Sequence, residues 1–346
     1  MKRITAVLTA VVIGISILFF SFGTLFRGGL TKNPAEAVPL HEKLLQGYQN
    51  LSLALGKDCI GNFYITDERM IPKRTAYSAG NVQKNIDVVN SYAESFSVPF
   101  YWLVAPTAVG IYSDTLSSSA PQASEQVLLN TAAEGVGSNV TWIDIYGTMY
   151  GARDSYIYYR SDNRWTTYGA FCAYKTAVRK LGFEPFGFDR YVIEHRNSEF
   201  RGLYSQLTQY EGVDADVLDI YNCQDGAPIQ SITSPLTGLT FPSLYQESET
   251  EEPYQIFLPE TEPILNLETG VHNDKSLLVL SDSYGSCFVP FLTQHYRNLT
   301  FVNITTASQD DLKKIYPSVY PQVLLLCSAD TLAAKDGFSL IDFEKY

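Results

Sequence analysis

Short apolar runs suited to buried strands alternate along this chain with segments whose apolar residues recur at helical spacing. Strands are expected at residues 98–106, 140–145, 277–281, 299–302 and 323–326. Helices are expected at residues 81–96, 124–133, 168–181, 287–292 and 309–314. Such alternation predicts an α/β fold with a mainly parallel sheet in three layers. Sheets of this kind place active sites beyond the carboxyl ends of their strands.

The amino-terminal region predicts a membrane anchor. Residues 4–25 form an uncharged, mostly apolar run, preceded by Lys2 and Arg3 and closed by Arg27. This is close to the length that a membrane helix needs, and the positive charges before it predict that everything after the run is exported. A small-x-small sequence at 35–37 lies beyond the run, so a retained signal anchor is favoured over a cleaved signal peptide.

We therefore divide the chain into an anchor at 1–28, a juxtamembrane connector at 29–78 and an α/β domain at 79–346. Between about residues 190 and 270 the strand and helix pattern gives way to sequence containing Pro, Gly, Ser and Glu. Because a structureless loop of this length is uncommon inside a compact domain, the insertion is expected to carry small strands or helices that form a lid or an appended layer.

Charge and cysteine content exclude several classes of protein. A net charge of −12 and a sequence pI near 4.8 argue against a nucleic-acid partner, which needs a basic surface. The five cysteines leave at least one unpaired, and no close pair of Cys, or cluster of His, Asp and Glu, has the spacing of a metal site. We expect neither a metal nor another cofactor.

The most informative segment is residues 277–286, where an apolar run stops at a small polar turn. Ser283 is expected between a strand end and a helix start, where unpaired N–H groups and the helix dipole favour negative charge. A developing oxyanion could be held there. The same residues allow a plainer interpretation, in which Asp282 or Ser283 only caps the helix.

A second segment, residues 158–170, places polar and aromatic side chains at the start of a threonine-capped helix. A carboxylate two residues ahead of another functional group can bring both into one cleft. The aromatic side chains could stack on sugar rings or could pack in the core, and the sequence leaves both open. They are Tyr156, Tyr158, Tyr159, Trp165, Tyr168 and Tyr284.

These two segments resemble the DHHW family of exported proteins, related to the SGNH hydrolases and to alginate O-acetyltransferase-like acyltransferases. The family's Asp-His-His-Trp-Thr-Thr-x-Gly-Ala signature corresponds to residues 162–170, and its strand followed by Asp-Ser-Tyr corresponds to 277–284. Further similarity extends through residues 200–205, 216–221 and 289–296, so the resemblance covers most of the chain after Leu55. It implies a flavodoxin-like or SGNH-hydrolase-like fold.

In catalytic relatives the Ser is the nucleophile, and the Asp and second His of the signature complete a triad. The resemblance then implies that Ser283 is the nucleophile and Asp162 the orienting acid, while the position of the base is Arg164. A guanidinium stays protonated and cannot take the proton of a serine hydroxyl. A Gly-Asn pair that the family has before a Pro is also replaced, by the sequence at 258–263.

Three possibilities remain open at this point. His195 or His272 could enter the cleft and supply the base. Arg164 could bind an anionic substrate group, with Glu260 or the substrate itself as base. Alternatively, there is no hydrolytic chemistry.

We therefore expect an exported, membrane-tethered protein of the cell envelope that binds a surface or secreted polysaccharide and is catalytically degenerate. The alternative is an active polysaccharide O-acetyltransferase or carbohydrate esterase that uses Ser283. In either case substrate contacts are expected from Tyr159, Trp165, Asp282 and Tyr284.

Overall fold

The computed structural model describes residues 41–117, 120–246, 253–259, 261–314 and 320–342. The predicted anchor at 1–28 lies outside the described residues. Within the described ranges, no helix combines the length and the apolar character that crossing a bilayer requires.

A seven-stranded sheet forms the centre of the molecule, in the order β5-β4-β12-β10-β11-β9-β8. Its first five strands are parallel, and β9 and β8 continue the sheet in antiparallel pairing. The strands are β4 (Phe100–Ala105), β5 (Val140–Ile143), β8 (Ile229–Thr233), β9 (Ile264–Thr269), β10 (Ser276–Ser281), β11 (Asn298–Asn303) and β12 (Val323–Ser328). The predicted mixed α/β fold with a mainly parallel sheet is confirmed.

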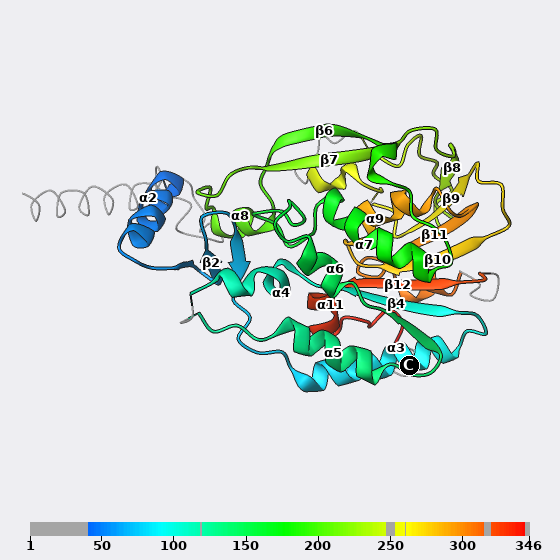
Figure 1. Ribbon diagram of the computed structural model, residues 1–346, viewed down its shortest axis with the longest axis horizontal. Coiled ribbons are helices and arrows are strands. Elements are labelled where there is room, and N and C mark those ends of the chain that lie inside the picture. Colours follow the sequence, from blue (N-terminus) through cyan, green and yellow to red (C-terminus); the bar gives the residue numbers. More distant parts are fainter. Residues whose placement is uncertain (1–40, 118–119, 247–252, 260, 315–319, 343–346) are drawn as a thin grey trace, which may run out of the picture.

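Helices cover both faces of this sheet (Figure 1). One face carries α4 (Ala108–Tyr112), α6 (Tyr146–Gly151), α7 (Thr167–Lys180) and α9 (Gly285–Leu292). The other carries α3 (Ala79–Glu94), α5 (Glu125–Gly135), α10 (Gln309–Leu312) and α11 (Ala329–Ala333). Along β12, Leu324 packs into the first core and Leu325 into the second, as the alternation of side chains in a strand requires. Burial on both faces explains why the central strands read as unbroken apolar runs.

The order of the parallel strands marks where a ligand is expected, beyond the carboxyl ends of β10 and β12, and we call this region the crevice. If the parallel strands β10, β11, β12, β4 and β5 are numbered 1 to 5, their order across the sheet is 2-1-3-4-5. This is the flavodoxin-like arrangement, except that the chain begins at strand 4. The chain leaves β10 toward β11 on one side and returns to β12 on the other. Doubly wound sheets bind ligands at such a switch point, beyond the carboxyl ends of the strands, which here are the ends of β10 and β12.

The insertion contains regular structure, as expected, but not all of it is appended. β6 (Tyr191–Phe200) and β7 (Asp216–Cys223) form a two-stranded antiparallel ribbon, and α8 (Leu203–Thr208) lies between them in sequence. The 3-10 turns η3 (Phe188–Arg190) and η4 (Pro253–Ile256) flank this region. β8 and β9, however, extend the central sheet itself, which the pattern of the sequence did not predict.

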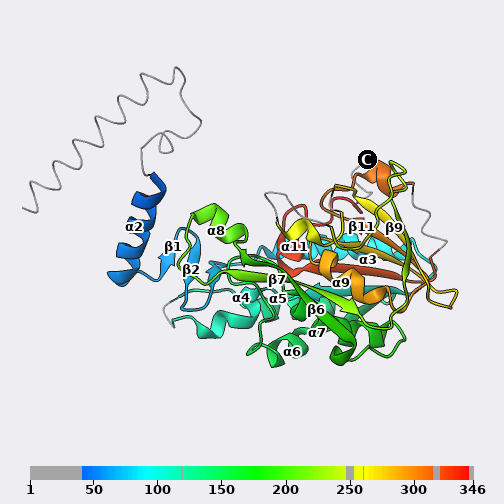
Figure 2. The ribbon, with the colours of Figure 1, turned by 90° about the horizontal axis from the view of Figure 1, so that it is seen from above.

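The predicted connector also contains more structure than expected. It contains the helix α2 (His41–Ala54), followed by a small antiparallel sheet of β1 (Cys59–Ile60), β2 (Phe63–Ile65) and β3 (Met70–Pro72). Figure 2 shows α2 and this sheet at one end of the molecule. The Met70 N–H donates to the Arg160 carbonyl over 2.9 Å, so the small sheet contacts the signature segment. A 3-10 turn, η2 (Ser113–Thr115), completes the short elements.

Candidate functional site

Ser283 lies in the turn between β10 and α9, half-buried, at the switch point of the sheet. Its carbonyl accepts hydrogen bonds from the Ser286 N–H at 3.4 Å and from the Tyr254 hydroxyl at 3.5 Å. Within the described ranges its own hydroxyl makes no hydrogen bond, and so no base is placed to take its proton. The sequence correctly predicted the turn; the plain capping interpretation does not hold for the Ser283 hydroxyl.

Asp282 joins the ends of β10 and β12 across the switch point. One carboxylate oxygen accepts from the Tyr284 N–H at 3.0 Å. The other accepts from the Ser328 N–H at 2.8 Å, the Ser328 hydroxyl at 2.9 Å and the Thr331 hydroxyl at 2.6 Å. Burial raises the pKa of Asp282 above its ordinary value although these hydrogen bonds oppose the shift. The Asp282 carboxylate therefore holds the floor of the crevice together.

The signature segment is bonded directly to the Ser283 turn. The Trp165 indole N–H donates to the Tyr284 carbonyl over 3.1 Å, and the Tyr284 hydroxyl donates to the Asn163 carbonyl over 2.5 Å. The Trp165 and Tyr284 rings also pack with their centroids 4.9 Å apart. Two segments more than 100 residues apart therefore meet at one site, as the resemblance implied.

Asp162 and Arg164 form a buried, bidentate ion pair. The Arg164 Nε lies 2.6 Å from Asp162 Oδ1 and its Nη2 lies 2.9 Å from Oδ2. The Asp162 carboxylate also accepts from the backbone N–H groups of Arg164 at 3.0 Å and Leu203 at 2.9 Å. Burial alone would raise the pKa of Asp162, but the Arg164 charge and these hydrogen bonds outweigh it and hold the pKa below its ordinary value.

The insertion contributes a residue that sequence reasoning missed. The Tyr254 ring, fully buried in η4, lies under the Arg164 guanidinium with 3.5 Å between its centroid and Cζ. The Tyr254 hydroxyl also donates to Cys287 Sγ at 3.3 Å. A guanidinium on an aromatic face gains a cation–π attraction, so Tyr254 adds to the forces that hold Arg164 against Asp162. No local signal around Tyr254 marks it for this position.

A second buried carboxylate, Asp216 on β7, holds the signature segment in place through hydrogen bonds. It accepts hydrogen bonds from the Tyr156 hydroxyl at 2.5 Å, the Arg160 N–H at 2.7 Å and the Ser161 hydroxyl at 2.7 Å. The Ser161 hydroxyl in turn accepts from the Gly202 N–H at 3.0 Å. Because Asp216 of β7 binds Tyr156, Arg160 and Ser161, the β6–β7 ribbon supports the site and does not merely cover it.

Gly202 is required by the close approach of Asp162. A Cβ at position 202 would lie 2.3 Å from the Asp162 Cβ. We expect Gly202→Ala to lower the free energy of unfolding by about 1–3 kcal/mol, measured by urea denaturation, because the turn must shift to relieve the overlap. Gly147→Ala is the matched control. Nothing lies within 4 Å of a Cβ at position 147, so this helical substitution should be neutral or slightly stabilising. Equal effects of the two substitutions would contradict this interpretation of Gly202.

The four residues expected to contact substrate are all buried. Tyr159 and Trp165 are almost completely buried in the core, and Tyr284 and Asp282 use their polar groups within the protein. The Tyr159 hydroxyl has no hydrogen-bond partner among the described residues. Core packing accounts for these rings, and substrate contact at these positions stays a prediction.

The structure places no imidazole of the described side chains beside Ser283. His195, on the exposed face of β6, pairs through Nδ1 with Asp219 at 2.5 Å. His272 is exposed in the loop before β10, at the opposite end of a six-residue strand from Ser283, about 20 Å away. His295 is buried near the same opposite end, with Nε2 2.7 Å from the Tyr174 hydroxyl, and burial lowers its pKa to about 4. Glu260 lies outside the described residues.

A second ion pair borders the crevice and was not predicted. The Arg74 Nε and Nη2 lie 3.2 and 3.1 Å from the two carboxylate oxygens of Asp330. Asp330 is in the first turn of α11, two residues after the Ser328 to which Asp282 is bonded. Both partners are about one-third exposed, so this pair is an accessible charged group close to the end of β12.

This arrangement can bind a ligand, but among its described residues the base of an acyl-transfer site is missing. The N–H groups of Tyr284, Gly285 and Ser286 donate to Asp282 and Ser283 within the turn, so charge on a bound oxygen would be stabilised mainly by the positive end of the α9 dipole. The guanidinium at the position of the base cannot accept a proton. Burial raises the pKa of Cys287 to about 11, so this neighbouring thiol stays protonated at neutral pH and does not replace Ser283 as nucleophile. Among the described side chains, no group of three His, Cys, Asp or Glu could hold a metal ion.

Solved structures of low sequence identity share the fold. A DHHW family protein from Eubacterium siraeum is 20% identical, with a TM-score of 0.68 over 80% of this chain and 94% of that chain. PatB1 of Bacillus cereus is 17% identical, with a TM-score of 0.67 over 80% of this chain and 98% of that chain. The O-acetyltransferase domain of Pseudomonas putida AlgJ is 14% identical, with a TM-score of 0.50 over 84% and 96% of the two chains. No curated protein matches the chain.

The family model for DHHW protein matches residues 49–302. This range contains the signature turn, the β6–β7 ribbon, Tyr254 and the Ser283 turn, which are the parts that meet at the crevice. The match spans most of the chain and includes both segments that build the site, and the chain therefore belongs to the DHHW family.

Proposed function

We propose that this protein binds a surface or secreted polysaccharide at the crevice around Ser283 and has lost the acyl-transfer chemistry of active relatives. In this proposal Ser283, Asp162 and Arg164 keep the positions of a nucleophile, an acid and a base. The Arg164 guanidinium, however, is a structural cation that fixes the signature turn. The crevice then serves recognition.

The observation that carries this proposal is the bidentate Asp162–Arg164 pair. Both Asp162 oxygens and two nitrogens of Arg164 are used by the pair itself, and Tyr254 covers one face of the guanidinium. A side chain held in this way neither accepts a proton from Ser283 nor turns freely toward a ligand. An unactivated serine hydroxyl is a weak nucleophile.

Two further observations support the class of ligand and the location. The chain belongs to the DHHW family, and the resemblance described above implies an exported protein; the O-acetyltransferase domain of AlgJ shares the fold. The apolar run at 4–25, preceded by Lys2 and Arg3, supports a single-pass anchor with the domain outside the cell membrane. Release of the full-length chain from membranes by alkaline carbonate, without detergent, would contradict this tether.

The alternative is an active polysaccharide O-acetyltransferase or carbohydrate esterase. It is favoured by the position of Ser283 at the switch point and at the start of α9, and by PatB1, which shares the fold and has been solved with a sulfonyl adduct. In that case the base must come from the substrate or from a residue outside the described ranges, such as Glu260.

A serine-reactive fluorophosphonate distinguishes the two functions. The purified full-length protein is incubated with the probe between pH 6 and pH 9, and modification of Ser283 is followed by mass spectrometry of the peptides. We expect no modification, and hydrolysis of an aryl acetate no faster than by Ser283→Ala. Modification of Ser283, together with turnover that Ser283→Ala abolishes, would establish the alternative.

Binding is tested separately from chemistry. Ser283→Trp fills the half-buried turn with a large ring, whereas Ser283→Ala leaves the crevice open. We expect the Trp variant to lose at least tenfold in affinity for the polysaccharide that binds, measured by titration calorimetry, and the Ala variant to bind like the wild type. If both variants bind like the wild type, the ligand does not occupy this crevice.

A further inference from the structure

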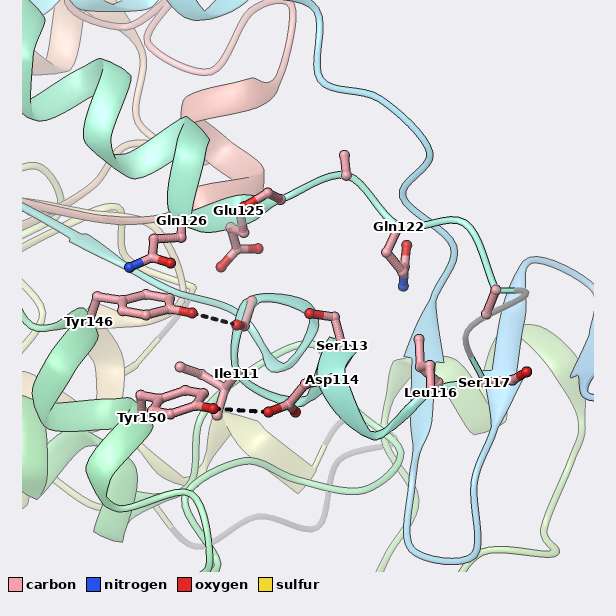
Figure 3. Close-up of a pocket in the computed structure, with 14 residues that line it drawn as sticks. Ile111, Ser113, Asp114, Leu116, Ser117, Gln122, Glu125, Gln126, Tyr146 and Tyr150 are labelled. Atoms are coloured by element: carbon pink, nitrogen blue, oxygen red, sulfur yellow. Dashed lines mark hydrogen bonds between the residues drawn. The ribbon is translucent and has the colours of Figure 1, made fainter.

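A large pocket lies beside the crevice, on the same edge of the sheet. It has a volume of about 730 Å³ and is formed by the segment that follows β4 together with α4, α5 and α6 (Figure 3). This volume is in the range of pockets that hold small ligands. Nothing in the mechanism considered above uses it.

Two tyrosines form an aromatic platform in this pocket. The rings of Tyr146 and Tyr150 are nearly parallel, with an interplanar angle of 12° and centroids 6.0 Å apart. Their hydroxyls are held by the Gly110 carbonyl at 3.1 Å and by Asp114 at 2.9 Å, as Figure 3 shows. The Arg153 guanidinium lies 4.0 Å from the Tyr150 centroid. The platform is therefore preorganised, yet Tyr150 remains 37% exposed.

The remaining lining is polar and acidic. Asp114 is exposed, Glu125 is buried at the start of α5, and the exposed Gln126 side chain makes no hydrogen bond among the described residues. The two carboxylic acids that line the pocket in the described ranges are Asp114 and Glu125, and none of these lining residues is Lys or Arg; burial raises the pKa of Glu125 to about 7, so Asp114 carries most of the negative charge at neutral pH. Arg153 approaches Asp114 only at 3.8 Å, in a half-exposed pair that contributes little. Such a lining suits hydroxyl and amino groups and repels carboxylate groups.

The pocket is connected to the signature segment. The Tyr158 hydroxyl donates to the Pro106 carbonyl over 2.6 Å, and the Tyr112 and Tyr158 rings pack edge to face. The loop that begins at Pro106 follows β4, which is separated from β10 by β12 alone. Two strand spacings put the ends of β4 and β10, from which the pocket loop and the Ser283 turn begin, about 10 Å apart, and a polymer of several sugar rings is long enough to extend from one to the other.

We propose that this pocket is a second sugar subsite, specific for a neutral or amine-bearing polysaccharide and selective against one that carries carboxylates. The inference rests on the proposed polysaccharide binding and narrows its ligand. A sugar ring packs against the aromatic surface of the Tyr146 and Tyr150 pair that Arg153 leaves open, while Asp114 accepts hydrogen bonds from its hydroxyl or amino groups and Gln126 accepts or donates them.

The test compares three tetrasaccharides by titration calorimetry with the full-length protein: cellotetraose, a glucosamine tetramer and tetragalacturonate. We expect the first two to bind and tetragalacturonate to bind at least tenfold more weakly. Tyr150→Ala should weaken binding of the first two at least tenfold. Asp114→Asn should reduce the preference for the glucosamine tetramer over cellotetraose. Tyr48→Ala, which removes an exposed tyrosine on α2 that is not among the residues lining the pocket, is the matched control and should change nothing.

The outcomes separate this inference from the proposed function. If Ser283→Trp abolishes binding but Tyr150→Ala leaves it intact, the proposed subsite is overturned, and the proposed binding of polysaccharide at the crevice is retained. Tighter binding of tetragalacturonate would overturn the selectivity, and absence of binding by all three would overturn the subsite for these sugars. Thermal unfolding of each variant establishes that it is folded. If Tyr150→Ala does not fold, the test uses Asp114→Asn and Tyr150→Phe instead. Tyr150→Phe keeps the ring but loses the hydrogen bond to Asp114.

Discussion

Arg164→Met is expected to lower the free energy of unfolding by about 3–5 kcal/mol at pH 7, because it leaves the Asp162 carboxylate buried without its counter-charge. Asp162 is completely buried, and Arg164 supplies two of its side-chain hydrogen bonds. Met retains much of the packing volume of Arg, so the loss reports on the charge. Urea denaturation at pH 7 measures it.

The same variant should respond to pH in the opposite direction from the wild type. In the wild type the pKa of Asp162 is below its ordinary value, so the pair contributes stability above about pH 4 that is lost as the pH falls through the lowered pKa. Without Arg164, burial dominates and raises the pKa of Asp162, so acidification should relieve the penalty. The difference in unfolding free energy between wild type and Arg164→Met should therefore be larger at pH 7 than at pH 4.

A double variant supplies the control for this pair. Adding Asp162→Asn to Arg164→Met removes the unpaired charge, so the double variant should be more stable than Arg164→Met alone. Strict additivity of the two single effects would show that the pair does not couple, and the structural role given to Arg164 would then fail.

Asp282→Ala should also cost about 3–5 kcal/mol, for a different reason. Four donors from Ser328, Thr331 and Tyr284 lose their acceptor at the switch point of the sheet. Buried donors without partners each cost about 1–3 kcal/mol, although some of the cost is offset because a buried carboxylate is itself unfavourable. Urea denaturation followed by far-UV circular dichroism measures the loss.

Asp311→Ala is the matched control for Asp282. Asp311 closes a capping box with Ser308 at the start of α10, but it does so at the surface. Removal of an exposed cap costs about 1 kcal/mol, because water replaces the lost acceptor. If the two Asp→Ala substitutions cost the same, Asp282 does not hold the crevice together.

The elements nearest to the site could be predicted because their signals are local. β10, the turn at Ser283 and the Thr166 cap of α7, whose side chain accepts from the Gly169 N–H, are each encoded within a few residues. β9 could not be predicted in this way, since it joins the sheet by pairing with β11, about 30 residues later in the chain. Tyr254 was missed for the same reason: its position under Arg164 depends on a contact between distant segments.

The residues by themselves determined the α/β class, the strand-to-helix turn at Ser283 and, through the resemblance, which side chains meet across more than 100 positions. They also established that Arg164 cannot be a base, because the chemistry of a guanidinium does not depend on the fold. Only the tertiary structure decided that Arg164 is bound to Asp162 and Tyr254, that Trp165 and Tyr284 are buried, and that His272 lies at the opposite end of β10. Spacing along the chain encodes local conformation, whereas burial and partner choice depend on how distant segments pack, which no local pattern specifies.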